Sequence, residues 1–286
     1  MMRKIVHSIF ALLLCFSLLP TNTIVHANTA VSYLDAQGTT QTIEDYTIIN
    51  NTTTSLTSSD DSKGWYVVNE NIEINTRLQV IGDVHLILLN DSKLVVNGGI
   101  EVNDTNSLTI YSQNFDKDVM GRLEAVAVSG AGIGGNYKES NGTITINGGY
   151  IIAKGGVEAS CGGAGIGTGG NAKSIKNIII NNGYVETYGG YYGQSTEERD
   201  RNGAGAGIGG GGHSSSVSYI EINGGEIHAY AGFNGAAAIG GGGHEGELDN
   251  ITITGGLIYA QGTYKHGNVN SGQANAIGGG ANKKKF

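Results

Sequence analysis

The sequence predicts an all-β protein folded as a single right-handed parallel β-helix, with about three short strands in each coil. Two repeating patterns support this prediction. Alternating isoleucines followed by glycine occur four times, as ITINGGYIIAKGG from Ile144, IIINNGYVETYGG from Ile178, IEINGGEIHAYAG from Ile220 and ITITGGLIYAQGT from Ile251. A second block, GAGIGG or a close variant, recurs around Ile133, Ile166, Ile208, Ile239 and Ile277, at intervals of 33, 42, 31 and 38 residues. Repeats of this length indicate coils that become stable only when neighbouring coils cover their apolar edges.

The isoleucines of both patterns are expected to form the core. Side chains alternate between the two faces of a strand, so every second isoleucine points to the same side. Stacking the coils in register then turns these residues into aliphatic columns. The predicted core columns contain Ile133, Ile144, Ile146, Ile166, Ile178, Ile180, Ile208, Ile220, Ile222, Ile239, Ile251, Ile253 and Ile277.

Glycine is the most conspicuous component of the chain, with 49 residues against a single proline. Glycine permits positive φ and close backbone contact, but weakens an ordinary strand. A path with many sharp corners explains this usage, whereas a disordered glycine-rich polymer would lack the Val and Ile alternation seen here. The general rule for parallel crossovers makes the β-helix right-handed.

The first 27 residues are predicted to be a signal peptide. Arg3 and Lys4 precede an apolar run at 9–19, and the small-residue site Val25-His26-Ala27 follows. The run is shorter than the roughly 20 residues of a membrane span, so we expect a secreted, extracellular protein, associated with the cell wall or free, with no membrane insertion after cleavage. Loss of the two basic residues changes the formal net charge from −8 to −10, which disfavours nucleic-acid binding. Cys161 then remains alone, so no intramolecular disulfide is expected.

The rest of the chain divides into two predicted parts. Residues 28–64 are polar and form an N-terminal cap or lead segment. Residues 65–286 form the β-helix, with irregular short coils at 65–128 and glycine-rich repeats at 129–286. Insertions such as 191–202 are expected at the corners, where a loop can project without disturbing the stack.

Three possible cofactor motifs are interpreted as structural features. The G-x-G-x-x-G spacing at 130–135 lacks the helix that a dinucleotide site needs. The glycine runs also lack the aspartates of calcium-binding nonapeptide repeats. Calcium remains conceivable only at the acidic insertion with Glu197, Glu198 and Asp200, whose alternative is a solvated charge cluster.

His213 and His244 follow equivalent glycine runs, but two histidines without a third ligand make a poor metal site. We therefore predict no cofactor and no metal.

Catalytic carboxylates are not predicted. Polysaccharide-cleaving enzymes need clustered acidic groups, or calcium together with a basic residue. The outward carboxylates occupy different positions of the repeat and are expected not to cluster; they are Glu139, Glu158, Glu186, Glu221 and Glu226. The sequence therefore predicts a protein that is not an enzyme.

The outward residues of the strand after each NGG suggest a binding surface. With coils about 4.8 Å apart, Tyr150 should lie over Tyr184, and Tyr188 over Tyr230. A flat aromatic and polar strip of this kind suits stacking against sugar rings. The alternative is a set of cross-strand ladders that only stabilise the sheet, at about 0.2–1 kcal/mol per pair. The candidate ligand-binding residues are Tyr150, Tyr184, Glu186, Tyr188, His228, Tyr230 and Tyr259.

The GAGIGGG and ITINGG lines, between Trp65 and Gly280, resemble those of the glycine-rich β-helix repeat proteins that Gram-positive bacteria export to their surfaces. The resemblance implies a non-catalytic, carbohydrate-binding or adhesin-like protein whose partner is a polysaccharide or a host-surface glycan. Two alternatives stay open, a polysaccharide lyase or hydrolase of the pectate-lyase-like class and a passive structural stalk. Such proteins often carry a wall anchor or further modules, and here the chain ends at Lys283-Lys284-Lys285-Phe286. Two interpretations stay open: the lysines solvate an exposed coil edge, or the chain is a truncated piece, which we favour.

Overall fold

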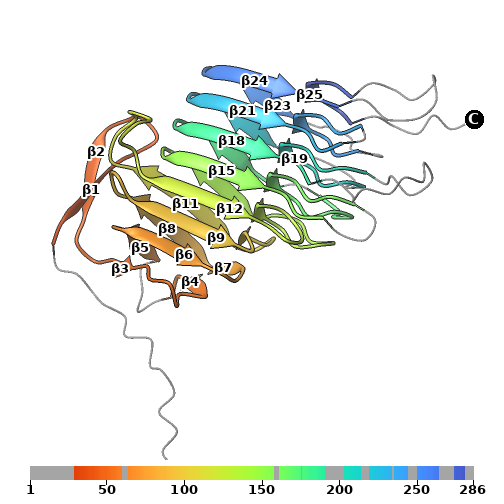
Figure 1. The fold of residues 1–286 in the computed structure, drawn as a ribbon. Helices are drawn as coiled ribbons and strands as arrows, with labels where there is room; N and C mark the ends of the chain where they lie inside the picture. Colours follow the sequence, from red (N-terminus) through yellow and green to blue (C-terminus); the bar gives the residue numbers. More distant parts are fainter. Residues whose placement is uncertain are drawn as a thin grey trace, which may run out of the picture.

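The structure is a computed structural model that describes residues 29–59, 64–157, 161–174, 176–190, 203–213, 219–233, 235–243, 250–263 and 274–280. Every regular element within these residues is a β-strand. Three long sheets run through the stack of coils, and a separate two-stranded sheet lies beside the first of these coils (Figure 1). We call the two-stranded sheet B and the long sheets A, C and D.

The strands are assigned to the sheets as follows. Sheet A contains β3 (Thr47–Ile48), β5 (Trp65–Val68), β8 (Asp83–Leu88), β11 (Ser107–Ser112), β14 (Thr143–Ile146), β17 (Ile178–Ile180), β20 (Ile220–Ile222) and β23 (Ile251–Ile253). Sheet D contains β6 (Asn71–Ile74), β9 (Lys93–Asn97), β12 (Arg122–Val126), β15 (Tyr150–Lys154), β18 (Tyr184–Tyr188), β21 (Glu226–Tyr230) and β24 (Leu257–Gln261). Sheet C contains β4 (Ser55–Thr57), β7 (Leu78–Ile81), β10 (Ile100–Glu101), β13 (Ile133–Gly134), β16 (Ile166–Gly167), β19 (Ile208–Gly209), β22 (Ile239–Gly240) and β25 (Ile277–Gly278). Sheet B contains β1 (Val31–Leu34) and β2 (Thr40–Ile43).

From β5 onward, each coil passes through sheet A, then sheet D, then sheet C. Strands one coil apart are parallel partners, as the tiers of β15, β18, β21 and β24 in Figure 1 illustrate. In sheet A, the four repeat isoleucines pair in sequence, in the order Ile144, Ile178, Ile220 and Ile251. The predicted parallel β-helix with three strands per coil is thereby confirmed.

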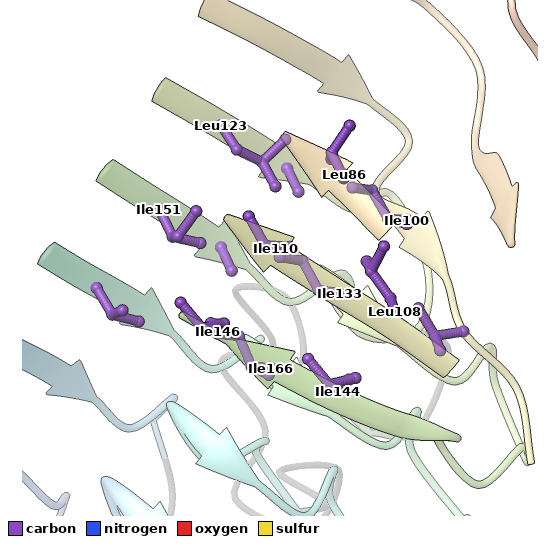
Figure 2. Packing of buried hydrophobic residues seen from close by; sticks show 14 of the residues in the cluster. Leu86, Ile100, Leu108, Ile110, Leu123, Ile133, Ile144, Ile146, Ile151 and Ile166 are labelled. Atoms are coloured by element: carbon purple, nitrogen blue, oxygen red, sulfur yellow. The ribbon is translucent and has the colours of Figure 1, made fainter. Parts of the chain in front are cut away.

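Aliphatic columns between the three sheets form the core. Leu108 pairs with Ile144 and Ile110 with Ile146, and Figure 2 shows these side chains one coil above another. All the predicted core isoleucines from Ile133 to Ile239 are fully buried. Burying such a side chain contributes about 1.5–3 kcal/mol, so the repeated columns are the main source of the favourable energy of folding.

The last described coil departs from the predicted core. Ile251 is only partly buried, and Ile253 and Ile277 are each 40% exposed. The physical reason is that each column needs a coil on both sides, and none of the described residues covers β23 or β25 on their far side. These three residues continue the columns in register but are not enclosed by them.

The glycines of sheet C explain how the coils approach one another so closely. Gly167 in β16 has φ +139°, a conformation that L-residues rarely adopt, and pairs with Gly209 of the next coil. A Cβ atom at Gly167 would lie 1.9 Å from the carbonyl oxygen of Gly209. Any side chain at this corner would therefore push neighbouring coils apart.

The N-terminal segment differs from the predicted cap. β3 pairs with β5 and β4 with β7, so the parallel sheets begin at Thr47, earlier than the expected start at residue 65. β1 and β2 form an antiparallel hairpin, which packs on the outer face of sheet A, where β1 contacts β11 (Figure 1). The hairpin therefore covers the side of the stack. The coils at 65–128 also follow the same order of sheets as the later repeats.

Aromatic residues on the outer face of sheet A hold the hairpin in place. Trp65 and His85 are stacked, with ring centroids 4.2 Å apart, and the ring of Tyr33 from β1 lies 5.0 Å from Trp65 and 4.8 Å from Tyr111.

A buried apolar cluster lies between the N-terminal segment and sheet A. It contains Val31 and Tyr46 of the N-terminal segment and Val67, Ile87 and Tyr111 of sheet A. These outward residues of sheet A thus form a second, smaller core.

Two titratable groups belong to this second core. His85 Nδ1 lies 3.0 Å from the Tyr111 hydroxyl, and His85 Nε2 lies 3.6 Å from a carboxylate oxygen of Asp83. Burial lowers the pKa of His85, an effect that Asp83 opposes. Burial also raises the pKa of Tyr111 to about 12. The packing therefore favours the neutral imidazole and the protonated phenol.

The side chain of Arg77 stabilises the corner of the coil that precedes sheet C. Its guanidinium donates hydrogen bonds to five backbone carbonyl oxygens, which belong to Gly98 (2.8 Å), Ser129 (3.3 Å), Ala131 (3.0 Å), Gly134 (3.2 Å) and Gly135 (3.5 Å). Burial lowers the pKa of Arg77 to about 10, while Glu101, whose carboxylate lies 4.0 Å away, opposes the shift. The side chain stays charged at neutral pH and joins its own coil to the first glycine-rich corner.

Candidate functional site

The outer face of sheet D carries three columns of outward side chains, which we call the D wall. Along each strand of five residues in this sheet, buried and partly exposed positions alternate as predicted, except at the last coil, which is more exposed. The first column contains Asn71, Lys93, Arg122, Tyr150, Tyr184, Glu226 and Leu257. The second contains Glu73, Val95, Glu124, Ile152, Glu186, His228 and Tyr259. The third contains Asn97, Val126, Lys154, Tyr188, Tyr230 and Gln261.

Four of the candidate residues form one continuous stack of rings. Tyr150 and Tyr184 have ring centroids 4.4 Å apart, Tyr184 and His228 5.1 Å, and His228 and Tyr259 4.5 Å. The stack follows the first column and then crosses to the second, because Glu226 occupies the position above Tyr184. Aromatic rings at these separations attract one another beyond simple burial.

The third column holds a separate pair. Tyr188 and Tyr230 are stacked, with centroids 5.0 Å apart and an angle of 15° between the rings. The centroid distance is close to the spacing of the coils, so the ring faces lie against each other along the axis of the β-helix. The predicted pairing is therefore present, but most ring faces are engaged within the stacks. The D wall offers ring edges and hydroxyl groups to solvent instead of a flat aromatic strip.

Carboxylates and an imidazole link the rings. The Tyr188 hydroxyl donates a hydrogen bond to Glu186, and His228 Nε2 lies 2.8 Å from a carboxylate oxygen of Glu226. The hydrogen bond to Glu186 raises the pKa of Tyr188, and burial adds to the effect. Burial, followed by the influence of Tyr150 and Glu186, raises the pKa of Tyr184 to about 12. Both phenols therefore stay protonated near neutral pH, and the Tyr188 proton is the one donated to Glu186.

Two of the outward carboxylates border Tyr184. Glu186 and Glu226 both lie near enough to Tyr184 to raise its pKa, although their positions in the repeat differ. Glu226 pairs with Tyr184 across adjacent strands, and Glu186 lies two residues beyond Tyr184 on the same face of β18, so each carboxylate borders Tyr184. Glu221 lies on β20 of sheet A, and Glu139 lies in a corner between sheets C and A, apart from this pair. Glu158 lies outside the described residues.

Several cations border the aromatic residues. The guanidinium of Arg122 lies 4.0 Å from the ring centroid of Tyr150, the Lys154 ammonium lies 5.5 Å from that of Tyr188, and the Lys117 ammonium lies 5.9 Å from that of Tyr184. Cations over tyrosine rings are attracted by the ring quadrupole. Within the described part of the chain, none of these three cations forms an ion pair.

A pocket of about 290 Å³ opens at the start of the first column. It lies between β9, β12 and the loop at 113–121 that joins β11 to β12. Its lining consists of Asn71, Asp91, Ser92, Lys93, Lys117, Asp118, Val119, Met120, Arg122 and Tyr150. The pocket therefore continues the D wall at the end where its cations gather.

Sequence reasoning missed this pocket and found only Tyr150 among its lining residues. Arg122 could have been found, because the strand RLEAV aligns with YIIAK in the register of sheet D. The repeat pattern could not indicate that Lys117 lies in the pocket, because Lys117 belongs to a loop that does not repeat. All seven candidate ligand-binding residues nevertheless lie on the D wall.

The described residues contain no group of three His, Cys, Asp or Glu side chains placed to hold a metal ion. Glu197, Glu198, Asp200 and His244 lie outside the described ranges, so the predictions that involve them stay untested. Cys161 is buried and forms no disulfide. No helix among the described residues has the length and apolar character needed to span a membrane.

Comparison of the chain with models of known protein families, with curated proteins and with solved structures gave no match in any of the three cases. Arguments about function therefore rest on the chemistry of the D wall.

Proposed function

We propose that this chain is a non-catalytic, secreted or cell-surface protein that binds a polysaccharide along the D wall. The observation that carries the proposal is the concentration of hydrogen-bonding groups on one outer face, where tyrosine hydroxyls share the columns of the D wall with Arg122 and Lys154, two cations that form no ion pair among the described residues. A polysaccharide that runs along the axis of the β-helix would meet one side chain of each column at every coil, since the coil spacing of about 4.8 Å is close to the length of one sugar unit. Repeated weak contacts of this kind add up along a chain of sugars.

The raised pKa values of two tyrosines support a binding role for these residues over a role as catalytic bases. An active-site base must lose its proton near the working pH, whereas the pKa values of Tyr184 and Tyr188 are both raised. The Tyr188 proton is held by Glu186, so Tyr188 would offer its oxygen as an acceptor to a sugar hydroxyl, while the Tyr184 phenol stays protonated. Glu186 and Glu226 beside Tyr184 are the observation that keeps a polysaccharide-cleaving enzyme as the second candidate. Release of reducing sugar or of unsaturated uronide from a panel of pectins and glucans would establish that alternative.

The third candidate function is a passive structural stalk. The ring stacks support it, because rings stacked between coils can serve only to stabilise the sheet. Two variants distinguish the contribution of ring stacking from the contribution of the hydroxyl groups. In the triple variant Tyr184→Phe, Tyr188→Phe, Tyr230→Phe, the rings and their stacking remain but three hydroxyls are lost. The corresponding alanine variant loses both. Tyr219→Phe, which precedes β20 of sheet A, is the matched control on another face.

The test is binding to a glycan array, with the melting temperature of each variant measured in parallel. We expect the wild type to bind, the phenylalanine variant to lose binding at an unchanged melting temperature, and Tyr219→Phe to behave as wild type. A wild-type protein that binds no glycan, or a phenylalanine variant that binds as well as wild type, would contradict the proposal.

A further inference from the structure

We infer that the pocket at the start of the D wall is a subsite for an anionic sugar residue, so that the preferred ligand is an acidic polysaccharide. This inference rests on the proposed function and specifies its ligand class. The subsite is formed by Arg122 and Lys117 together with Tyr150, and Lys93 lies at its edge.

Two cations that line the pocket, Arg122 and Lys117, have no ion-pair partner among the described residues. Lys93 is engaged by Glu124, with its ammonium 3.1 Å from a carboxylate oxygen. Asp91 and Asp118 also line the pocket, yet among the described residues neither forms an ion pair with Arg122 or Lys117. Lys93, Lys117 and Arg122 are balanced in number by Asp91, Asp118 and Glu124, so an acidic sugar would be recognised through direct contact with Arg122 and Lys117 and not through a net positive charge of the pocket.

Arg122 is the residue best placed to contact an anionic group of the sugar. Its guanidinium is fixed against the ring of Tyr150, at 4.0 Å from the ring centroid. Its Nε atom is buried and has no hydrogen-bond acceptor within the described residues. The planar guanidinium fork matches the two oxygens of a carboxylate, so an acidic sugar in the pocket would be held through the terminal Nη groups of Arg122.

The size and position of the pocket agree with one sugar residue at the end of a longer chain. Its volume of about 290 Å³ lies at the lower end of the range for small-ligand sites. Tyr150 belongs both to the pocket lining and to the ring stack, so a polysaccharide seated in the pocket would continue onto Tyr184. Because the whole chain has a formal net charge of −8, it repels polyanions in general. Selective binding of an acidic glycan would therefore require direct contacts with individual cations such as Arg122 and Lys117.

The experiment compares each acidic polysaccharide with a neutral counterpart of the same backbone. The probes are polygalacturonate against its fully methyl-esterified form, and dextran sulfate against dextran, with dissociation constants measured by calorimetry at fixed ionic strength. We expect one charged probe to bind at least about tenfold more tightly than its neutral form. The double variant Arg122→Gln, Lys117→Gln should lose that preference, by roughly 10- to 100-fold in affinity for the charged probe.

The matched control is Lys138→Gln, Lys173→Gln, which removes the same charge from the corner between sheets C and A. It should keep the preference, apart from a small uniform change. The inference is wrong if charged and neutral probes bind equally, if the pocket variant keeps the preference, or if the control variant loses it as well.

These failures differ from a failure of the proposed function. If neutral glycans bind and the tyrosine variants abolish that binding while charge has no effect, the D wall binds polysaccharide and only the acidic subsite is refuted. If neither neutral nor charged glycans bind to the wild type, both proposals fail together.

Discussion

Position in the stack should decide what a core isoleucine contributes to stability, and Ile222 and Ile253 allow a matched comparison. They pair with each other in sheet A, so the substitutions Ile222→Ala and Ile253→Ala make the same chemical change one coil apart. Ile222 is fully buried between Ile180 and Ile253, whereas Ile253 is 40% exposed.

The expected magnitudes follow from this difference in burial. Removing three buried carbons from Ile222 costs about 2.4 kcal/mol in transfer energy. The cavity that remains raises the loss to roughly 3–4 kcal/mol. For Ile253, the 40% exposure reduces the transfer term to about 1.4 kcal/mol, and solvent fills the space. Ile222 also contacts coils on both sides, and interfaces between neighbouring coils dominate the stability of repeat proteins.

Urea unfolding followed by circular dichroism measures both losses as changes in the free energy of unfolding. We expect Ile222→Ala to lose at least about 1.5 kcal/mol more than Ile253→Ala, at a similar dependence on urea. Equal losses, or a larger loss at Ile253, would refute the argument that the columns derive their energy from being enclosed on both sides.

Three further predictions concern buried polar groups and their titration. Thr187→Val should raise the free energy of unfolding in urea by about 1 kcal/mol, because the Thr187 hydroxyl is buried without a hydrogen-bond partner among the described residues; a loss of stability would contradict this. Arg77→Met should lower the same free energy by about 2–4 kcal/mol, because it leaves several backbone carbonyls unsatisfied, and an unchanged value would refute the role of this side chain. His85 has a lowered pKa in the folded state, so its contribution is complete above its ordinary pKa near 6.5 and is lost as the pH falls through the folded-state value. The fluorescence of Trp65, the single tryptophan, should change as the pH falls below 6.5 and His85 becomes protonated, and His85→Gln should reduce the change; an equal change in the variant would exclude His85 as its source.

The repeats made much of the fold predictable from the sequence. Ile144, Ile178 and Ile220 recur in the same context, so their stacking in one column follows from periodicity and strand geometry alone. The same alignment placed Tyr150 over Tyr184 in sheet D. It could not give the orientation of the rings, because stacking between coils depends on rotamers that the sequence pattern does not specify.

Features outside the repeats were not predictable in this way. The hairpin of sheet B covers Trp65 and His85 through contacts between segments that share no pattern. Arg77 reaches a corner more than 50 residues further along the chain. Lys117 approaches Tyr184 from a loop that occurs once. Each of these depends on tertiary packing of a single, non-repeating element, for which periodicity carries no information.

A crystal structure of the protein with a bound oligosaccharide would test the central claim most directly. The glycan would be chosen from the array as the tightest binder, with the oligosaccharide long enough to span several coils. The account predicts sugar residues that follow the axis of the β-helix over the D wall, with Tyr184 and Tyr230 hydroxyls within hydrogen-bond distance of sugar oxygens. Sugar bound on sheet A or sheet C, with the D wall left empty, would contradict it.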